Sequence, residues 1–152
     1  MTTSRNSEHS RGVAATIAIE VRQSVLEAIT AHARDEAPLE CCGILIGRER
    51  RVERAARARN ILGSTTRYLV DAEDHFAALR SARESGQSVV GFYHSHPASP
   101  PSPSETDRAE AAYPGHLHLI VFPGSATQAA EIRAFRLVDS GNFLAVEIVP
   151  IP

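Results

Sequence analysis

Lysine is absent from the 152-residue sequence, and all sixteen basic side chains are arginines. No reaction of this chain can therefore use a lysine as nucleophile or Schiff-base amine. The only two cysteines, Cys41 and Cys42, are adjacent, and neighbours in a strand point to opposite faces, so a bridge between them would be strained. A disulfide framework is excluded, which is typical of a protein in the reducing cytoplasm.

The sequence has no apolar run near the roughly 20 residues that a membrane-spanning helix requires. Its first residues are polar, without the charged stretch and apolar core that mark a secretory signal. The net charge of −2 at pH 7 argues against nucleic acid as a partner. Neither a membrane protein nor a nucleic-acid binder is therefore expected.

What the sequence contains is enough apolar material for one domain, with 43% hydrophobic residues. The polar residues 1–14 are expected to form a flexible leader, and residues 15–152 a single domain. The spacing of apolar residues sets the expected elements. Strands are expected over residues 16–21, 42–47, 50–60, 68–70, 88–93, 117–122, 131–138 and 143–149, and helices over residues 24–34, 71–84 and 104–114.

Strands and helices mix along the sequence, and hairpin-length loops follow late in the chain, which favours one mixed sheet with helices packed on it. On the expected helix over residues 71–84, Phe76, Leu79 and Arg80 are placed to pack on one side. Six arginines from Arg48 to Arg59 could form a binding patch. The favoured interpretation is a solvated edge strand, on which charges block pairing with another strand.

Two histidines, His94 and His96, follow the expected strand over residues 88–93 at a spacing of two. In extended backbone this spacing puts both imidazoles on one face, roughly 6–7 Å apart at the backbone. Two neutral imidazoles on one face suit a divalent metal, zinc first. A loop with four prolines over residues 97–103 then leads to Asp107, whose carboxylate can be a third ligand. Three protein ligands leave one tetrahedral position open, as in a catalytic zinc site.

The same histidines belong to a longer pattern. His94-x-His96-Pro97 is followed by Ser104-x-x-Asp107, and upstream Glu40 precedes the apolar residues 41–47. This pattern resembles the JAMM (MPN+) zinc metalloprotease family, in which a Glu before such a strand is followed by His-x-His-Pro and Ser-x-x-Asp. Every polar position of the family motif has a match here, and the resemblance spans about residues 16–150.

The resemblance implies the JAB/MPN fold, an α/β (α+β) architecture in which a single mixed, largely antiparallel, curved sheet is flanked by helices, related to the cytidine-deaminase-like architecture. It implies one zinc ion per chain, bound by His94, His96 and Asp107. It also implies that Glu40 hydrogen-bonds the zinc-activated water, takes its proton and delivers it to the leaving amine. Ser104 would then help to stabilise the oxyanion of the tetrahedral intermediate.

Each of these residues also has a purely structural role open to it. Glu40 could be a solvated turn residue before a strand, and a histidine pair on a strand is often no metal site. Ser104 is also the expected N-cap of a helix in which Asp107 holds the third position, as in a capping box. Capping and ligation by Asp107 can coexist because a carboxylate has two oxygens. The role of Ser104 stays open between helix cap and oxyanion donor.

Three further groups of residues are assigned no catalytic role. Ser95 lies between the two ligands on the opposite face, where packing or support of a ligand is expected. Cys41 and Cys42 could supply a thiol nucleophile, but their apolar strand favours small core residues. His116 and His118 repeat the His-x-His spacing without a loop-delivered carboxylate, and they are interpreted as a polar strand face near the cleft.

The resemblance implies a zinc-dependent isopeptidase or peptidase of the compact standalone prokaryotic type, since the short segment after Asp107 leaves no room for a large insertion. Its expected substrate is an amide at the C-terminus of a ubiquitin-like, sulfur-carrier protein, whose extended tail pairs with a sheet edge. The alternative is a non-catalytic MPN scaffold that binds partner proteins, although such members lack ligands that are present here. A zinc nucleoside deaminase is not favoured, because His-x-Glu and Pro-Cys-x-x-Cys are missing. The oligomeric state, a homodimer included, stays open.

Overall fold

The computed structural model describes residues 17–152, so the leader expected over residues 1–14 lies outside the described residues. None of the helices described there is long and apolar enough to cross a membrane. The elements of this part of the chain are β1 (Ala18–Arg22), α1 (Gln23–Glu36), β2 (Cys42–Arg48), β3 (Arg51–Ala58), α2 (Ala72–Glu84), β4 (Ser88–Ser95), α3 (Glu105–Glu110), β5 (Leu117–Phe122), β6 (Glu131–Asp139) and β7 (Asn142–Ile151).

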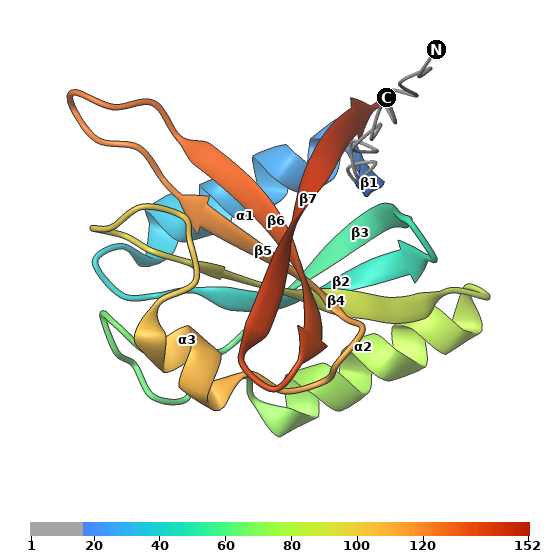
Figure 1. The fold of residues 1–152 in the computed structure, drawn as a ribbon. Coiled ribbons are helices and arrows are strands. Elements are labelled where there is room, and N and C mark those ends of the chain that lie inside the picture. Colours follow the sequence, from blue (N-terminus) through green and yellow to red (C-terminus); the bar gives the residue numbers. More distant parts are fainter. Residues whose placement is uncertain (1–16) are drawn as a thin grey trace, which may run out of the picture.

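The strands form one sheet that closes on itself in the order β1-β3-β2-β4-β5-β6-β7, with β7 beside β1 (Figure 1). Pairing is antiparallel in β2–β3, β2–β4, β5–β6 and β6–β7, and parallel in β1–β3, β1–β7 and β4–β5. The prediction of a single mixed sheet flanked by helices is confirmed. Its closure was not predicted, because the pairing of β1 with β7 joins opposite ends of the domain.

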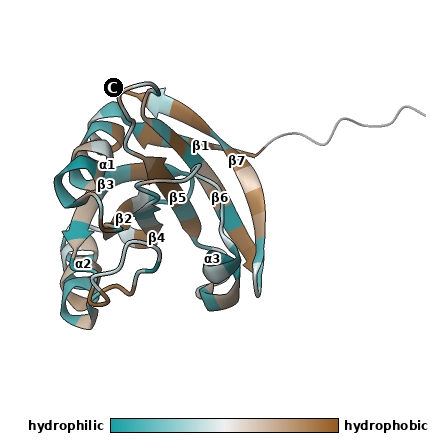
Figure 2. Ribbon diagram, turned by 90° about the vertical axis from the view of Figure 1, so that its left-hand side faces the viewer, coloured by the Kyte–Doolittle hydropathy of each residue, from teal (hydrophilic) through white to brown (hydrophobic). Residues whose placement is uncertain are grey.

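The helices α1 and α2 cover opposite faces of the part of the sheet that contains β2 and β4 (Figure 1). Ile29 of α1 belongs to the apolar cluster on one face, together with Tyr93 of β4. Ala82 of α2 belongs to the cluster on the other face, together with Phe92. Figure 2 shows apolar residues, in brown, concentrated on the central strands, while the helices carry teal polar residues. Because side chains alternate along a strand, His94 points to the same face as Phe92.

The buried face of α2 differs from the face that the sequence predicted. Phe76 and Leu79 are 65% and 42% exposed, and the buried residues of the helix are Ala78 and Ala82. Small side chains allow the helix axis to approach the sheet closely, and the larger apolar side chains then fall on sides that the sheet does not cover. The prediction that Phe76, Leu79 and Arg80 pack on the sheet was wrong.

The arginine-rich strand β3 is also not the edge strand that was predicted. Arg51 and Val52 pair with β1, and the strand pairs with β2 along its length. Surface ion pairs engage three of its arginines, Arg51 with Glu20, Arg57 with Asp35 and Arg59, one residue beyond the strand, with Asp71. Such exposed pairs contribute little to stability, because water and salt screen them. Neighbouring carboxylates therefore balance much of this basic run.

Two elements are shorter than the sequence predicted. The helix that begins after Ser104 ends at Glu110, short of Pro114. The strand expected over residues 68–70 is reduced to a single bridge between Asn60 and Val70. Both irregular segments contribute residues to the wall of a cavity next to His94.

Close contact between β4 and β5 depends on Gly91. A Cβ atom at this position would overlap the backbone of Leu117 on β5, whose carbonyl carbon would lie 2.7 Å away. The pairing of Gly91 with Leu117 begins a parallel register that continues to His94 and Ile120. The absence of a side chain at Gly91 therefore helps to position the strand that carries the histidines.

We expect Gly91→Ala to lower the free energy of unfolding by about 3 kcal/mol, the upper end of the usual cost of overpacking. Ser88→Thr is a matched control, because it adds one methyl group to the same strand at an exposed position. This control should change stability by less than about 0.5 kcal/mol. Urea unfolding of the three proteins measures both effects, and an unchanged midpoint for Gly91→Ala would contradict the tight β4–β5 contact.

Candidate metal centre

Three side chains from two elements meet at the C-terminal end of β4. His94 pairs in the sheet with Cys42 of β2 and Ile120 of β5, and its side chain is 3% exposed. His96 follows the strand and is 4% exposed. The first turn of α3 brings Asp107 to the same place, with a side chain 7% exposed. The structure thus brings the three predicted ligands together in a buried site.

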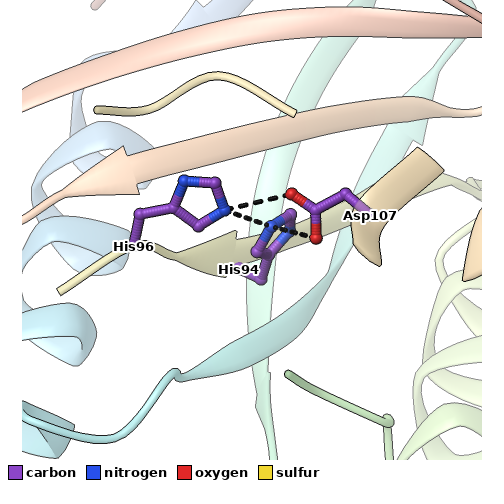
Figure 3. Close-up of side chains that lie close together, drawn as sticks. All are labelled: His94, His96 and Asp107. Carbon is purple, nitrogen blue, oxygen red and sulfur yellow. Dashed lines mark hydrogen bonds and ion pairs between the residues drawn. The ribbon is translucent and has the colours of Figure 1, made fainter. Parts of the chain in front are cut away.

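The potential ligand atoms point toward one another (Figure 3). His94 Nε2 lies 3.2 Å from Asp107 Oδ1, and His96 Nε2 lies 3.0 Å from Asp107 Oδ2. The two imidazole Nε2 atoms are 3.2 Å apart. One nitrogen or oxygen from each residue lies within 4.8 Å of the others, and among the described residues this is the group that could hold a metal ion.

A backbone carbonyl fixes the tautomer of His96. Its Nδ1 lies 2.7 Å from the carbonyl oxygen of Pro100, which can only accept a hydrogen bond. Nδ1 therefore carries the proton, and Nε2 of the neutral ring presents its lone pair to His94 and Asp107. A second partner that orients a ligating histidine in this way is a usual part of metal sites.

His94 is held by stacking. The ring of Tyr68 lies parallel to it, with centroids 4.3 Å apart and an interplanar angle of 20°. Burial lowers the pKa of His94, which keeps its ring neutral at pH 7. His94 Nδ1 is buried and has no hydrogen-bond partner among residues 17–152.

The carboxylate of Asp107 carries the charge of the cluster. Burial alone would raise the pKa of Asp107, but hydrogen bonds with His94 and His96 hold it well below its ordinary value. Burial likewise opposes protonation of His96, whereas its contacts with Asp107 and the Pro100 carbonyl raise the pKa above 6.5. When both rings are neutral, the Nε2 lone pairs of His94 and His96 face the carboxylate of Asp107. This arrangement requires a cation between them, either a proton or a metal ion.

The predicted capping box orients Asp107. Asp107 N donates to Ser104 Oγ at 3.0 Å, and Ser104 N donates to Asp107 Oδ2 at 2.9 Å. Capping and contact with the histidines do coexist on this carboxylate. Ser104 Oγ acts only as an acceptor in the cap, so its hydroxyl proton stays available to another group.

Glu40 is a buried residue and not a solvated turn residue. It is 4% exposed, its backbone N donates to Ser64 and its carbonyl accepts from the Asn60 side chain. Burial raises the pKa of Glu40 to about 7, and the charges of His96 and Asp107 also act on it. Its Oε1 has no hydrogen-bond partner among the described residues. A carboxyl group in such a state can exchange protons near neutral pH.

The residues that were given no catalytic role occupy the core or its edge. Cys41 and Cys42 are buried free thiols, and burial raises their pKa values to about 11 and about 12, so neither is a nucleophile at pH 7. Ser95 Oγ accepts from Cys41 N at 2.8 Å. His118 is 5% exposed rather than part of an open polar face, and burial lowers its pKa to about 4.

Sequence reasoning did not identify the residues that support the ligands. Tyr68 stacks on His94, the Pro100 carbonyl binds His96, and Asn60 holds the backbone of Glu40. Asn60 also binds the backbone of Arg67 and Leu69, which ties the loop that carries Tyr68 to the Glu40 turn. A lone Asn after a strand is only a weak sequence signal for such a role.

Comparison with known proteins gives relatives along most of the chain. The family described as "Prokaryotic homologs of the JAB domain" matches residues 22–138. A desampylase of Haloferax volcanii is 36% identical over 118 residues, which cover 76% of this chain and 85% of the relative. A probable TtuB-protein conjugate cleaving protease of Thermus thermophilus is 38% identical over 130 residues, 85% of this chain and 82% of the relative. A CysO-cysteine peptidase of Mycobacterium tuberculosis is 33% identical over 121 residues, 78% and 82% of the two chains.

Solved structures give the same fold. A protein from Desulfitobacterium hafniense superposes with a TM-score of 0.79 and 29% identity, over 88% of this chain and 92% of that one. A JAB1/MPN domain protein from Archaeoglobus fulgidus, at 20% identity, superposes with a TM-score of 0.54 over 87% and 98% of the two chains. Fold, site and relatives define a JAMM-type hydrolase. The chain belongs to the prokaryotic JAB-domain family.

The donor set suits a divalent metal ion. Two imidazole nitrogens and one carboxylate are the three-ligand set of hydrolytic metal centres, which keep a further coordination position open. The fixed tautomer of His96 and the convergence of two imidazole Nε2 atoms on one carboxylate fit a metal ion.

We expect the purified chain to bind one divalent ion, and the affinity to fall as pH decreases. Protons compete for His96, whose pKa is raised, so affinity should drop by about tenfold per pH unit for each proton displaced. Zinc titration calorimetry between pH 8 and pH 5.5 measures this slope. His96→Ala should lose the ion, whereas His116→Ala, a histidine outside the cluster, should retain it. Uptake that is independent of pH, or equal in both variants, would refute the site.

Proposed function

We propose that the chain is a zinc-dependent peptidase or isopeptidase that hydrolyses an amide at the C-terminus of a ubiquitin-like, sulfur-carrier protein in the reducing cytoplasm. The observation that carries this proposal is the convergence of His94, His96 and Asp107 in one buried cluster, with a buried carboxyl group at Glu40. The names of the relatives, a desampylase, a CysO-cysteine peptidase and a TtuB-protein conjugate cleaving protease, support this substrate class.

One zinc ion per chain would be held by His94 Nε2, His96 Nε2 and an oxygen of Asp107. Bound zinc supplies Lewis acidity, which polarises a carbonyl group and lowers the pKa of water to about 7. The protein supplies the orientation: the Pro100 carbonyl fixes His96, Tyr68 stacks on His94 and the capping box holds Asp107.

Glu40 is assigned the transfer of protons. Its Oε1 is buried without a partner, and burial raises the pKa of the carboxyl group to about 7. A carboxyl group of this pKa accepts a proton from water as it attacks and gives it to the departing amine nitrogen, because neither protonation state is strongly favoured near neutral pH. The hydrogen bonds of the Glu40 backbone with Ser64 and Asn60 fix the point of the chain from which this side chain extends.

Ser104 is assigned a second task beside its cap. Its Oγ accepts from Asp107 N, which leaves the hydroxyl proton free to donate to an oxygen atom at the open side of the cluster. Donation to a carbonyl oxygen that becomes negative is the contribution of an oxyanion hole. One hydroxyl can therefore serve both helix and reaction.

A non-catalytic scaffold is the alternative, and nothing in the cluster favours it. A scaffold needs neither a raised pKa at Glu40 nor three ligand atoms in register, whereas both are present here. The direct test is cleavage of a ubiquitin-like protein fused through its C-terminal Gly-Gly tail to a second protein. Cleavage that stops with chelator and returns with zinc supports the hydrolase, and no cleavage by zinc-loaded protein would refute it.

Glu40→Gln should retain one zinc ion per chain and lose turnover by about 10²–10⁴-fold, because an amide cannot accept the proton. Metal content and single-turnover rate are measured on the same sample. Glu36→Gln is a suitable control, since Glu36 ends α1 at an exposed position. If Glu40→Gln instead loses the metal, Glu40 is a ligand and the assignment is wrong.

Ser104→Ala separates the two tasks of this hydroxyl group. We expect a loss of about 1 kcal/mol of stability from the missing cap. The rate at saturating zinc should fall by about 10²–10³-fold from the missing donor. Ser104→Thr keeps both the cap and the donor and serves as the control. Thermal melting and turnover are compared, and a Ser104→Ala protein that melts early yet cleaves at the parent rate would remove Ser104 from the reaction.

A further inference from the structure

A cavity of about 170 Å³ lies beside the metal-binding cluster and is used by none of the steps above. His94 and Asp107 form part of its wall, whereas Glu40, His96 and Ser104 do not. Half of the remaining lining residues carry aromatic or imidazole rings, namely Tyr68, His75, Phe92, Tyr113, His118 and Phe143. The cavity therefore has direct access to two of the three ligands and an apolar character of its own.

The rings of the wall support one another. His118 packs edge-on against Phe143, with centroids 5.3 Å apart, and lies 6.0 Å from Phe92. Phe92 in turn lies 5.3 Å from Tyr113. Phe92 and His118 are direct partners across the parallel β4–β5 pair, so the regular sheet holds this side of the cavity rigid. Such an arrangement accepts a flat group with little rearrangement.

Two buried nitrogens in this wall have no partner among the described residues. His118 is 5% exposed, and its Nε2 makes no hydrogen bond in that part of the chain. The same is true of His94 Nδ1, which carries a proton whenever Nε2 faces the cluster as a lone pair. A buried polar atom without a partner is unfavourable, so these atoms point to a ligand that offers them a polar edge.

The side-chain charges at the wall disfavour an anionic ligand. Asp107 and Glu110 are the carboxylates that line the cavity. Arg67 lies near but is already bound to Glu110, at 2.6 Å. Apart from an ion held by the cluster, the wall has no cationic side chain in the described part of the chain, so its side chains disfavour a carboxylate or phosphate.

We propose that this cavity is a substrate subsite that takes an uncharged, ring-bearing side chain with one hydroxyl or amide edge, contributed by the residue on the amine side of the scissile amide, because a Gly-Gly tail has no side chain on the acyl side. The proposal rests on the proposed function, because it assigns the cavity to the same substrate. A closed apolar cavity of about 150 Å³ accommodates benzene, so the volume fits a side chain of phenol size. The polar edge of that side chain pairs with His118 Nε2 while the ring contacts Phe92 and Phe143.

The first test measures binding without any reaction. 4-Methylphenol and toluene, which differ by one hydroxyl group, are titrated against the zinc-loaded protein and followed by ligand-detected NMR. We expect 4-methylphenol to bind with a Kd on the order of 1 mM and toluene to bind about 2–10-fold more weakly, for want of one hydrogen bond. His118→Phe should abolish the difference between the two probes while leaving toluene binding in place.

Two alanines of one segment provide a matched pair for the cavity itself. Ala111 lines it, whereas Ala109, on the neighbouring turn of α3, is exposed and does not. Ala111→Leu should weaken binding of both probes by at least about tenfold by filling the space, and Ala109→Leu should leave both unchanged. Retained binding in Ala111→Leu, or no binding to the parent below about 20 mM, overturns the proposal.

The second test asks whether the cavity belongs to the reaction. 4-Methylphenol should inhibit cleavage of the fusion protein with an inhibition constant equal to its Kd, and Ala111→Leu should lose this inhibition in step with binding. Binding without inhibition overturns the role as a subsite. If the parent binds 4-methylphenol but cleaves no fusion, the proposed function fails and the substrate role of the cavity fails with it, while the probe series still identifies a ring-binding site.

Discussion

The site depends on the burial of two imidazole lone pairs and one carboxylate within hydrogen-bond distance of each other. The lone pairs and the carboxylate repel one another unless a cation lies between them, and this repulsion is poorly screened inside a protein. The surrounding structure serves to hold it together. The Pro100 carbonyl fixes His96, Tyr68 lies on His94, and the capping box fixes Asp107. The apolar packing of the sheet supplies the free energy that offsets this repulsion. The three groups are placed so that a cation can lie between them.

The central strand β4 connects that packing to the chemistry. Alternate side chains send Tyr93 into the cluster covered by α1, while Phe92 and His94 face the side covered by α2. Gly91 permits the close approach of β5, and β5 places His118 next to Phe92. A single eight-residue strand thus carries part of the core, His94 near its end with His96 directly after it, and one wall of the adjacent cavity.

The sequence predicted which three side chains meet in the cluster because their positions are defined by local spacing. The interval of two places His94 and His96 on one face, and Ser104 and Asp107 form their capping box within four residues. The face of α2 was predicted wrongly, because Phe76 and Leu79 satisfy helical periodicity as well as Ala78 and Ala82 do, and only the approach of the sheet decides between them. Closure through β1 and β7, the stacking of Tyr68 and the burial of His118 depend on contacts between distant segments, which no local pattern reveals.

The brevity of α3 has a consequence for the behaviour of the protein in solution. A helix of six residues has too few internal hydrogen bonds to be stable by itself. The helix is therefore stabilised by the contacts of its first turn, which contains Asp107. An ion that binds the cluster only when α3 is helical must also make the opening of α3 slower. Ion binding and the helical state of α3 are then coupled. The exchange rate of the amide protons in this short helix therefore reports whether the cluster is occupied.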